Sequence, residues 1–446
     1  MRIEIPRCYD SHSHLLATGQ MLSMVSLWDL QAPADVRHLE LHPRFYRGEW
    51  LLGFGWDQHR FPSPSFPTRF DLDAIFPSTP VAFSRADGHA LWVNTKALEV
   101  TGLLKPVSEW RLPAGAEAIA DDRGLPTGLL IDRAMELIFS VIPQDSLTQK
   151  KKDLLEACAS YNRAGFTHLR DMSGDESQWQ ALCELEAEKS LTLYLDQNFT
   201  FERAEDFSKA LDLSIRARRE KHSHLQPRGL KFYVDGALGS EGALLSRPYP
   251  GGNSKGLQLW SLEQIQEWTQ KAWEQNLEMS VHAIGDEASF LVAQAARQTW
   301  EKGVHGVLNL EHAEVVRPET FDLLRGIPTV FHMQPCHWNS DRRWLKEKLG
   351  PLYAHVFRWT EARERGFEVI WGSDSPIEKP SLFDNQSALE HSPEAGIPAF
   401  PGDWWRPHVH PNPKWGEGCR TVIENGQVVR VDFDDRTVFE STVNSN

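Results

Sequence analysis

The sequence lacks the features that mark membrane-spanning, secreted and nucleic-acid-binding proteins. No segment approaches about 18 consecutive apolar residues, so we expect no transmembrane helix. Asp10, His12 and His14 stand where a signal peptide would be apolar. Asp and Glu number 62 against 47 Lys and Arg, and the net charge of −15 argues against nucleic acid or an anionic membrane as a partner. We therefore expect a cytoplasmic protein that acts on a small molecule.

Cysteine is scarce, and its spacing argues against cysteine-based sites. The five cysteines lie far apart with no Cys-x-x-Cys pair, so we expect neither a disulfide framework nor a cysteine zinc site. This usage fits a reducing compartment. The sequence also has no Gly-x-Gly-x-x-Gly at a strand-to-helix turn, which argues against an open dinucleotide-binding sheet.

The chain instead alternates short apolar runs with amphipathic stretches of helical period. Counting the run that leads to His12, this gives eight strand-like units, and such alternation predicts parallel strands in a closed (β/α)₈ barrel with its functional residues at the carboxyl ends of the strands. The expected strands are residues 3–9, 166–172, 191–199, 230–234, 279–284, 307–310, 329–333 and 369–371.

Two regions lie outside this alternation. Residues 19–135 are polar, aromatic and rich in proline, and we interpret them as a large insertion or lid region after the first strand of a barrel that occupies residues 1–385. Residues 386–446 form a C-terminal extension that ends in a hairpin, because Asn425-Gly426 lies between two apolar runs. Within this extension, the Trp- and His-rich stretch 404–410 is either a wall of the substrate pocket or a cover of the barrel.

Several residues that could bind a cation follow the predicted strands. A single histidine there is usually structural, and Asp374 by itself could cap a helix. A barrel, however, gathers all its strand ends around one mouth, where four histidines and an aspartate would be unsatisfied without a shared cation. Imidazole and carboxylate are typical zinc ligands. The residues at these strand ends that could bind a cation are His12, His14, Lys231, Asp235, His282, His312 and Asp374.

Two further groups of side chains are candidates for substrate contact. The first group follows an apolar run in the insertion and comprises Arg85, His89, Trp92 and Asn94. The second group, Gln334 and His337, follows the seventh predicted strand. Loops positioned by a scaffold often carry binding residues. The alternative is a hydrogen-bonded loop without a ligand.

The motifs together resemble the amidohydrolase superfamily, specifically amidohydrolase family 3, which includes N-substituted formamide deformylases. The resemblance covers about residues 9–380 and rests on the stretches Asp-Ser-His-Ser-His, Ser-Arg-Ala-Asp-Gly-His, Pro-Thr-Gly-Leu-Leu, Leu-Lys-Phe-Tyr-Val-Asp-Gly-Ala-Leu-Gly-Ser, Val-His-Ala-Ile-Gly-Asp, Leu-Glu-His-Ala, Met-Gln-Pro-Cys-His and Gly-Ser-Asp-Ser-Pro.

The resemblance assigns roles to the predicted ligands among these strand-end residues. It implies that His12 and His14 bind the more buried of one or two divalent ions, with zinc expected, and that His282 and His312 bind the second. Asp374 would touch the first ion and act as the catalytic base, while His312 also belongs to the catalytic group. Lys231 falls where the family can carry a carboxylated lysine (N6-carboxylysine) that bridges two ions; an unmodified lysine beside a single ion is the alternative.

The chain departs from the family at both ends. Family members usually begin with several strands of a small β-sandwich and complete it after the barrel, whereas about eight residues precede Asp10 here and the tail after Pro380 is short. We therefore expect this second domain to be reduced or missing.

Three functions remain open. The leading one is a metal-dependent hydrolase that cleaves the C–N bond of an amide-like small molecule, namely an N-acyl, N-formyl, carbamate or cyclic amide compound. The second is a metal-dependent deaminase or isomerase of the same superfamily. The third is a non-catalytic barrel that retains metal and binds a small molecule. A homo-oligomer is compatible with each.

Overall fold

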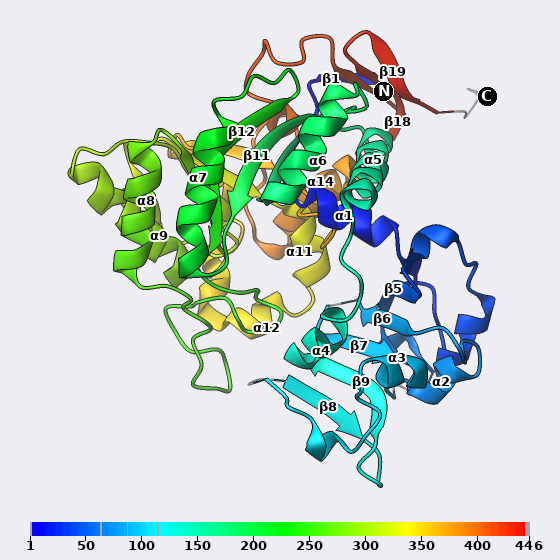
Figure 1. The fold of residues 1–446 in the computed structure, drawn as a ribbon. Helices are drawn as coiled ribbons and strands as arrows, with labels where there is room; N and C mark the ends of the chain where they lie inside the picture. The colour runs from blue at the N-terminus through cyan, green and yellow to red at the C-terminus, as the bar shows by residue number, and fades with distance from the viewer. Residues whose placement is uncertain (1, 63–64, 87, 114–115, 442–446) are drawn as a thin grey trace. The chain divides into compact units, whose positions relative to one another are not determined.

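The computed structural model describes residues 2–62, 65–86, 88–113 and 116–441, which form two compact units (Figure 1). One unit joins the residues before Thr18 to those from Leu154 onward, and the other comprises Thr18–Asp153. Each unit has its own sheet and core.

The larger unit is built on an eight-stranded parallel sheet that closes almost completely into a barrel. The neighbouring strands are, in order, β16 (Glu368–Trp371), β15 (Thr329–Met333), β14 (Leu308–His312), β13 (Glu278–Ala283), β12 (Leu225–Tyr233), β11 (Tyr194–Thr200), β10 (His168–Gly174) and β2 (Tyr9–Ser13). Just beyond the ends of β16 and β2, Asp374 N donates to His12 O at 2.8 Å and His14 N donates to Ser375 O at 2.9 Å. The predicted barrel-like parallel sheet is confirmed.

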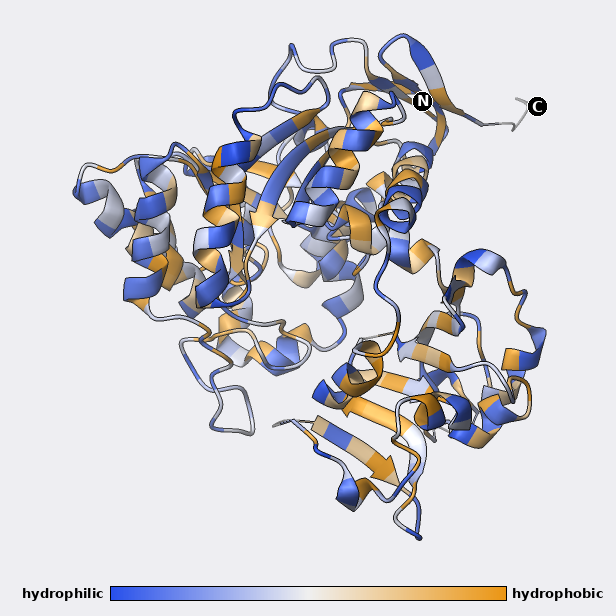
Figure 2. Cartoon of the chain, in the orientation of Figure 1, coloured by the Kyte–Doolittle hydropathy of each residue, from blue (hydrophilic) through white to orange (hydrophobic). Residues whose placement is uncertain are grey.

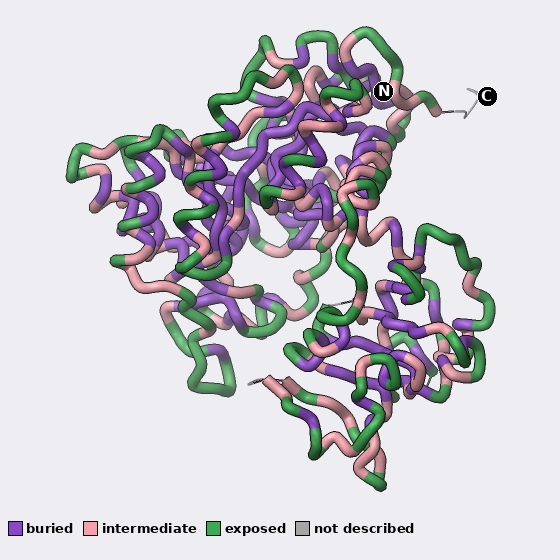
Figure 3. Tube along the Cα trace, viewed as in Figure 1, coloured by how far each residue is buried: buried purple, intermediate pink, exposed green. Residues whose placement is uncertain are grey.

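The segments that follow the strands form helices because their sequences bury one apolar face and cap the helix ends. In α8, for example, Ser261 and Gln264 form a reciprocal capping box, and Ile265, Trp268 and Ala272 are buried. Figure 2 shows mixed hydropathy along these helices, and Figure 3 shows them alternating between buried and exposed around a buried sheet. The helices of this unit are α6 (Glu176–Ala187), α7 (Phe207–Ala217), α8 (Leu262–Glu274), α9 (Asp286–Glu301), α10 (Pro318–Leu324), α11 (Pro335–Asp341), α12 (Leu345–Leu349), α13 (Trp359–Glu364) and α14 (Leu382–His391).

The predicted first strand, residues 3–9, is wrong as a single element. Its first half is β1 (Arg2–Pro6), which pairs with the C-terminal hairpin in a four-stranded antiparallel sheet of order β1-β17-β18-β19. At Arg7 the backbone takes a positive φ of 46°, which turns the chain before β2 begins in the barrel. The sheet therefore joins the two ends of the chain, with Ile3 opposite Ile423.

The hairpin itself is confirmed. Its strands are β17 (Arg420–Glu424) and β18 (Gln427–Phe433), and β19 (Arg436–Glu440) completes the sheet. Asn425 and Gly426 both have positive φ, as a tight two-residue turn requires.

The smaller unit carries a seven-stranded sheet with a core on each face. Trp92, Phe83 and Trp56 lie in one core, whereas Leu91 lies in the other, as the two-residue period of a strand requires. Its strands are β3 (Val25–Ser26), β4 (Tyr46–Arg47), β5 (Trp50–Trp56), β6 (Val81–Arg85), β7 (Ala90–Val93), β8 (Ala116–Ala120) and β9 (Pro126–Asp132); its helices are α2 (Arg69–Asp73), α3 (Thr95–Val100) and α4 (Glu136–Phe139). Helices α1 (Leu15–Leu22) and α5 (Leu147–Ala164) begin in one unit and end in the other.

Within the described part of the chain, every helix is too short or too polar to cross a membrane.

Candidate metal centre

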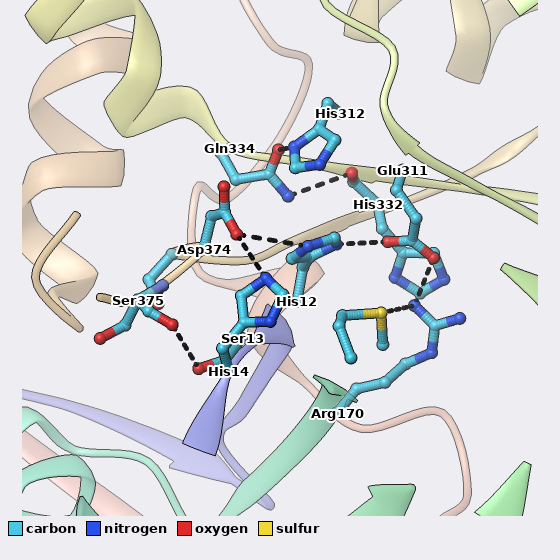
Figure 4. Close-up of polar contacts among 12 residues, drawn as sticks. His12, Ser13, His14, Arg170, Glu311, His312, His332, Gln334, Asp374 and Ser375 are labelled. Carbon is cyan, nitrogen blue, oxygen red and sulfur yellow. Dashed lines mark hydrogen bonds and ion pairs between the residues drawn. The ribbon is translucent and has the colours of Figure 1, made fainter. Parts of the chain in front are cut away.

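At the carboxyl end of the barrel, His12 of β2 and His14, which follows β2, lie against Asp374, which follows β16 (Figure 4). Nε2 of His12 lies 3.3 Å and Nε2 of His14 lies 3.2 Å from the same oxygen, Asp374 Oδ1. His12 is fully buried and Asp374 is nearly so. Burial by itself would raise the pKa of Asp374, but the two imidazoles hold it well below its usual range. The three residues offer ligand atoms close enough to share one cation.

A second group shares the same aspartate. His312, His337 and Asp374 each offer a ligand atom within 4.8 Å of the others. The ring of His312 lies 4.5 Å from that of His12 and 4.5 Å from that of His282, measured between centroids. The four predicted histidine ligands are thus gathered at one mouth.

Backbone strain allows both Glu311 and His312 to reach this site. Adjacent residues of a strand normally point to opposite faces. His312 and Ala313 have positive φ values of 66° and 47°, so the chain turns at the end of β14 and breaks the alternation. Asp374 also has a positive φ, of 59°. Non-glycine residues held in this region often mark functional sites.

Glu311 is a site residue that the sequence analysis missed. Its Oε2 lies 2.6 Å from Nδ1 of His12, and its Oε1 accepts a 2.7 Å hydrogen bond from Arg170. Although burial opposes ionisation, the Arg170 guanidinium holds the pKa of Glu311 well below its usual range. A carboxylate that accepts from one ring nitrogen directs the other nitrogen toward a metal.

Lys231 projects from β12 and is fully buried. Its Nζ lies 4.6 Å from the ring centroid of Tyr233, two residues along the same strand. Burial lowers the pKa of Lys231 to about 8.

The donor set fits a divalent cation. Three of the predicted ligand nitrogens are buried and find no hydrogen-bond partner among the described residues: His12 Nε2, Lys231 Nζ and His282 Nε2. Burying such polar atoms without a partner is costly. Burial lowers the pKa of His282 to about 3 and that of His312 well below its usual range, which keeps both rings in the neutral form that binds metal.

Comparison with known proteins identifies the family. The sequence profile of the amidohydrolase family matches residues 5–385. The chain belongs to this family. The assignment to amidohydrolase family 3 that the motifs predicted is confirmed.

Several known proteins align with most of this chain. YtcJ of Bacillus subtilis (strain 168) is 30% identical over 397 residues, which cover 87% of this chain and 73% of that protein. N-substituted formamide deformylase of Arthrobacter pascens is 24% identical over 69% of this chain and 58% of its own length. The crystal structure of an uncharacterized metal-dependent hydrolase from Pyrococcus horikoshii OT3 superimposes with a TM-score of 0.71 at 26% identity, covering 89% of this chain and 76% of that one.

Gln334 and His337 lie against the predicted ligand residues of this amidohydrolase. Oε1 of Gln334 lies 2.9 Å from Nδ1 of His312, so the amide oxygen can accept its proton and fix the ring. His337 places Nδ1 3.0 Å from Glu314 Oε1 and Nε2 3.7 Å from Asp374 Oδ2. Burial opposes protonation of His337, but its hydrogen bond to Glu314 raises its pKa to about 9. Their predicted contact with substrate stays a prediction.

The candidate substrate residues of the smaller unit divide into two kinds. Trp92 and Asn94 are buried and hold the unit together: Trp92 Nε1 donates to Thr68 O at 2.8 Å, and Asn94 Oδ1 accepts from Ala97 N at 2.9 Å as the cap of α3. Arg85 ends β6, and the exposed His89 places Nδ1 2.9 Å from Asp132 Oδ1. Substrate contact by these four residues also stays a prediction.

Within the stretch 404–410, His408 and His410 cover the barrel away from the candidate metal centre. His410 Nε2 lies 3.0 Å from Asp196 Oδ2 near the start of β11, and His408 Nδ1 lies 3.1 Å from the carbonyl of Tyr9 at the start of β2. Both imidazoles are buried. These contacts lie at the amino ends of the strands, whereas the metal centre lies at their carboxyl ends.

Proposed function

We propose that this amidohydrolase is a metal-dependent hydrolase that cleaves the C–N bond of an amide-like small molecule, such as an N-acyl, N-formyl, carbamate or cyclic amide compound. The observation that carries the proposal is the approach of two imidazoles to one oxygen of Asp374 at the barrel mouth. The relatives named a metal-dependent hydrolase and an N-substituted formamide deformylase support it.

The residues present divide naturally between two ions. His12, His14 and Asp374 would hold the first, and His282 with His312 would hold the second, with Lys231 as a carbamate between them. Bound divalent ions lower the pKa of water and polarise a carbonyl oxygen. Zinc suits a set of histidine and carboxylate ligands.

We assign the proton transfer to Asp374. Its Oδ1 faces His12 and His14, while its Oδ2 lies 3.7 Å from Nε2 of His337. Oδ2 is therefore the oxygen that accepts the proton of the attacking water and then returns it to the leaving nitrogen. Gln334, which accepts from Nδ1 of His312, leaves Nε2 of that ring as the free lone pair.

The test is hydrolysis of a panel of N-formyl, N-acyl, carbamate and cyclic amide compounds by the full chain, with detection of the released amine. We expect turnover of at least one class by wild type and a fall of about 10²–10⁴-fold in kcat in Asp374→Asn. Asp384→Asn, at an exposed position on α14, is the matched control. Equal turnover in Asp374→Asn and wild type contradicts the proposal. Release of ammonia from a ring amine with no amide cleavage would favour a deaminase instead.

A further inference from the structure

A second cluster of metal-ligating side chains lies outside the barrel, before the amino end of β12 and so at the opposite end from the metal centre. Cys183 of α6 and Glu220 and His222 of the segment between α7 and β12 each offer one ligand atom, and these atoms lie within 4.8 Å of one another. Cys183 and His222 are partly buried, and Glu220 is exposed.

One face of α6 packs against the segment between α7 and β12. Trp179, Cys183 and Glu186 are spaced four and three residues apart, so they share a face of the helix. The ring of Trp179 packs edge-on against His222 at 5.0 Å. Glu186 Oε1 accepts hydrogen bonds from the backbone N–H groups of Ser223, at 2.8 Å, and His224, at 2.7 Å. The carboxylate of Glu186 is therefore fixed by the backbone.

The same carboxylate orients the histidine. Glu186 Oε2 lies 2.5 Å from Nδ1 of His222, so a neutral ring that carries its proton on Nδ1 donates it to this carboxylate and has its lone pair on Nε2. Histidine ligands of metals usually donate their second N–H to a carboxylate in this way. Nε2 faces Glu220 Oε2 at 3.2 Å, close to the separation of about 3.4 Å expected for two ligands of a tetrahedral zinc.

We propose that Cys183, Glu220 and His222 bind a zinc-type divalent cation, with a fourth position open to water. Thiolate, imidazole and carboxylate together favour zinc over magnesium or calcium. Cys183 would bind as the thiolate and lose its proton to solvent. The ion would tie α6 to the segment that enters β12. The sequence analysis expected no cysteine zinc site because these ligands do not form a short-range motif: β11 and α7 separate Cys183 from the other two.

Cadmium titration of the full-length protein tests this site without reference to catalysis. A thiolate bound to Cd²⁺ gives an ultraviolet charge-transfer band, and the proposed mouth ligands include no cysteine. We expect a band in wild type whose amplitude corresponds to about one thiolate-bound ion per chain, and we expect its loss in Cys183→Ser and in His222→Gln. Glu186→Gln should weaken binding about 10–100-fold, because the ring of His222 is no longer held.

Two control variants separate this site from the metal centre. His12→Asn removes a predicted ligand at the mouth, and Cys336→Ser removes the buried thiol that faces Ser373 O; both should keep the band. Circular dichroism establishes that each variant is folded, and Zn²⁺ should raise the Tm of wild type by more than that of Cys183→Ser, which keeps only the metal centre at the mouth. No band in folded wild type, or a band that persists in Cys183→Ser, overturns the proposal. A cluster held only by the ion pair of His222 with its two glutamates would give the first of these results.

Discussion

Glu311 Oε2 lies 2.6 Å from Nδ1 of His12, and the pair is completely enclosed within the barrel. Arg170 holds the other carboxylate oxygen at 2.7 Å, so the glutamate stays ionised and cannot rotate away. The imidazole is therefore held with Nε2 toward Asp374. The relationship explains how a histidine in the first barrel strand is oriented by a residue of β14, which follows it by about 300 residues.

Glu311→Gln should weaken metal binding at the mouth about 10–100-fold, because His12 loses the acceptor that orients it. Removing the charge also leaves Arg170 buried without its partner, so unfolding should become easier by about 3–5 kcal/mol. Metal affinity is measured by competition with a chelator on protein that circular dichroism shows to be folded. Glu301→Gln, at an exposed position in α9, is the control. Unchanged metal affinity in Glu311→Gln would show that Glu311 does not orient His12.

His282 and His337 compete for the role of ligand to the second ion. The resemblance to family 3 implies His282, whereas the structure places His337 within ligand distance of His312 and Asp374. Because the hydrogen bond to Glu314 raises the pKa of His337 to about 9, its ring stays protonated at neutral pH and does not bind a cation, so we expect His337→Asn to keep its metal and to lose about tenfold or more in kcat. His282→Asn should lose one of about two ions. Elemental analysis of both variants separates the roles, and loss of an ion only in His337→Asn would reverse them.

Lys231 should carry carbon dioxide as a carbamate in the metal-loaded protein. An unmodified ammonium could not bind a cation, whereas a carbamate supplies two oxygens to bridge two ions. We expect protein loaded in ¹³C-bicarbonate to show a carbamate carbon signal by NMR that is missing in Lys231→Ala, together with fewer bound ions. Lys209→Ala, on the exposed side of α7, is the control. An identical spectrum in Lys231→Ala would show that Lys231 does not carry a carbamate.

His408 should make the fold sensitive to mild acid. Nδ1 lies 3.1 Å from Tyr9 O and Nε2 lies 3.4 Å from Asn385 Nδ2, so the folded protein keeps the ring neutral, with its proton on Nδ1. Asn385 cannot simply turn over, because its Oδ1 accepts from Cys336 N at 2.9 Å. Burial lowers the pKa of His408 from 6.5 to about 4.

In the unfolded chain His408 therefore binds a proton below pH 6.5, whereas in the folded chain it binds one only below about pH 4. The stability that depends on neutral His408 is full above pH 6.5, is lost progressively as the pH falls from 6.5 to about 4, and amounts to about 3 kcal/mol. Urea unfolding of wild type and His408→Gln at several pH values measures it. The free energy of unfolding of the variant should fall less steeply in this window; parallel curves would exclude His408 as the source.

The barrel could be predicted from the sequence because eight apolar runs alternate with helical stretches, and only a few folds satisfy that order. The gathering of four histidines at one mouth could be predicted because strand ends converge. The junction between β1 and β2 could not, since apolar residues lie on both sides of Arg7 and the positive φ of that residue is not visible in the sequence.

Glu311 escaped prediction for a related reason. In a regular strand it points away from the side that His312 occupies, and only the turn at His312 brings both to the mouth. Trp92 and Asn94 illustrate the opposite problem, because residue type alone does not distinguish an aromatic or amide that contacts a ligand from one that completes a core. Residues 404–410 were equally ambiguous until their contacts with Tyr9 and Asp196 placed them.

The most direct test of the account is the metal content of the purified full-length protein, measured by plasma mass spectrometry on wild type and on the double variant His12→Asn/His14→Asn. Wild type should contain about two divalent ions at the mouth, and the double variant should lose at least one of them together with amide hydrolysis while remaining folded. Both measurements are made in a Cys183→Ser background, so that the proposed outer site adds no ion. Equal metal content in the two proteins, or hydrolysis by folded wild type stripped of metal, would contradict the account.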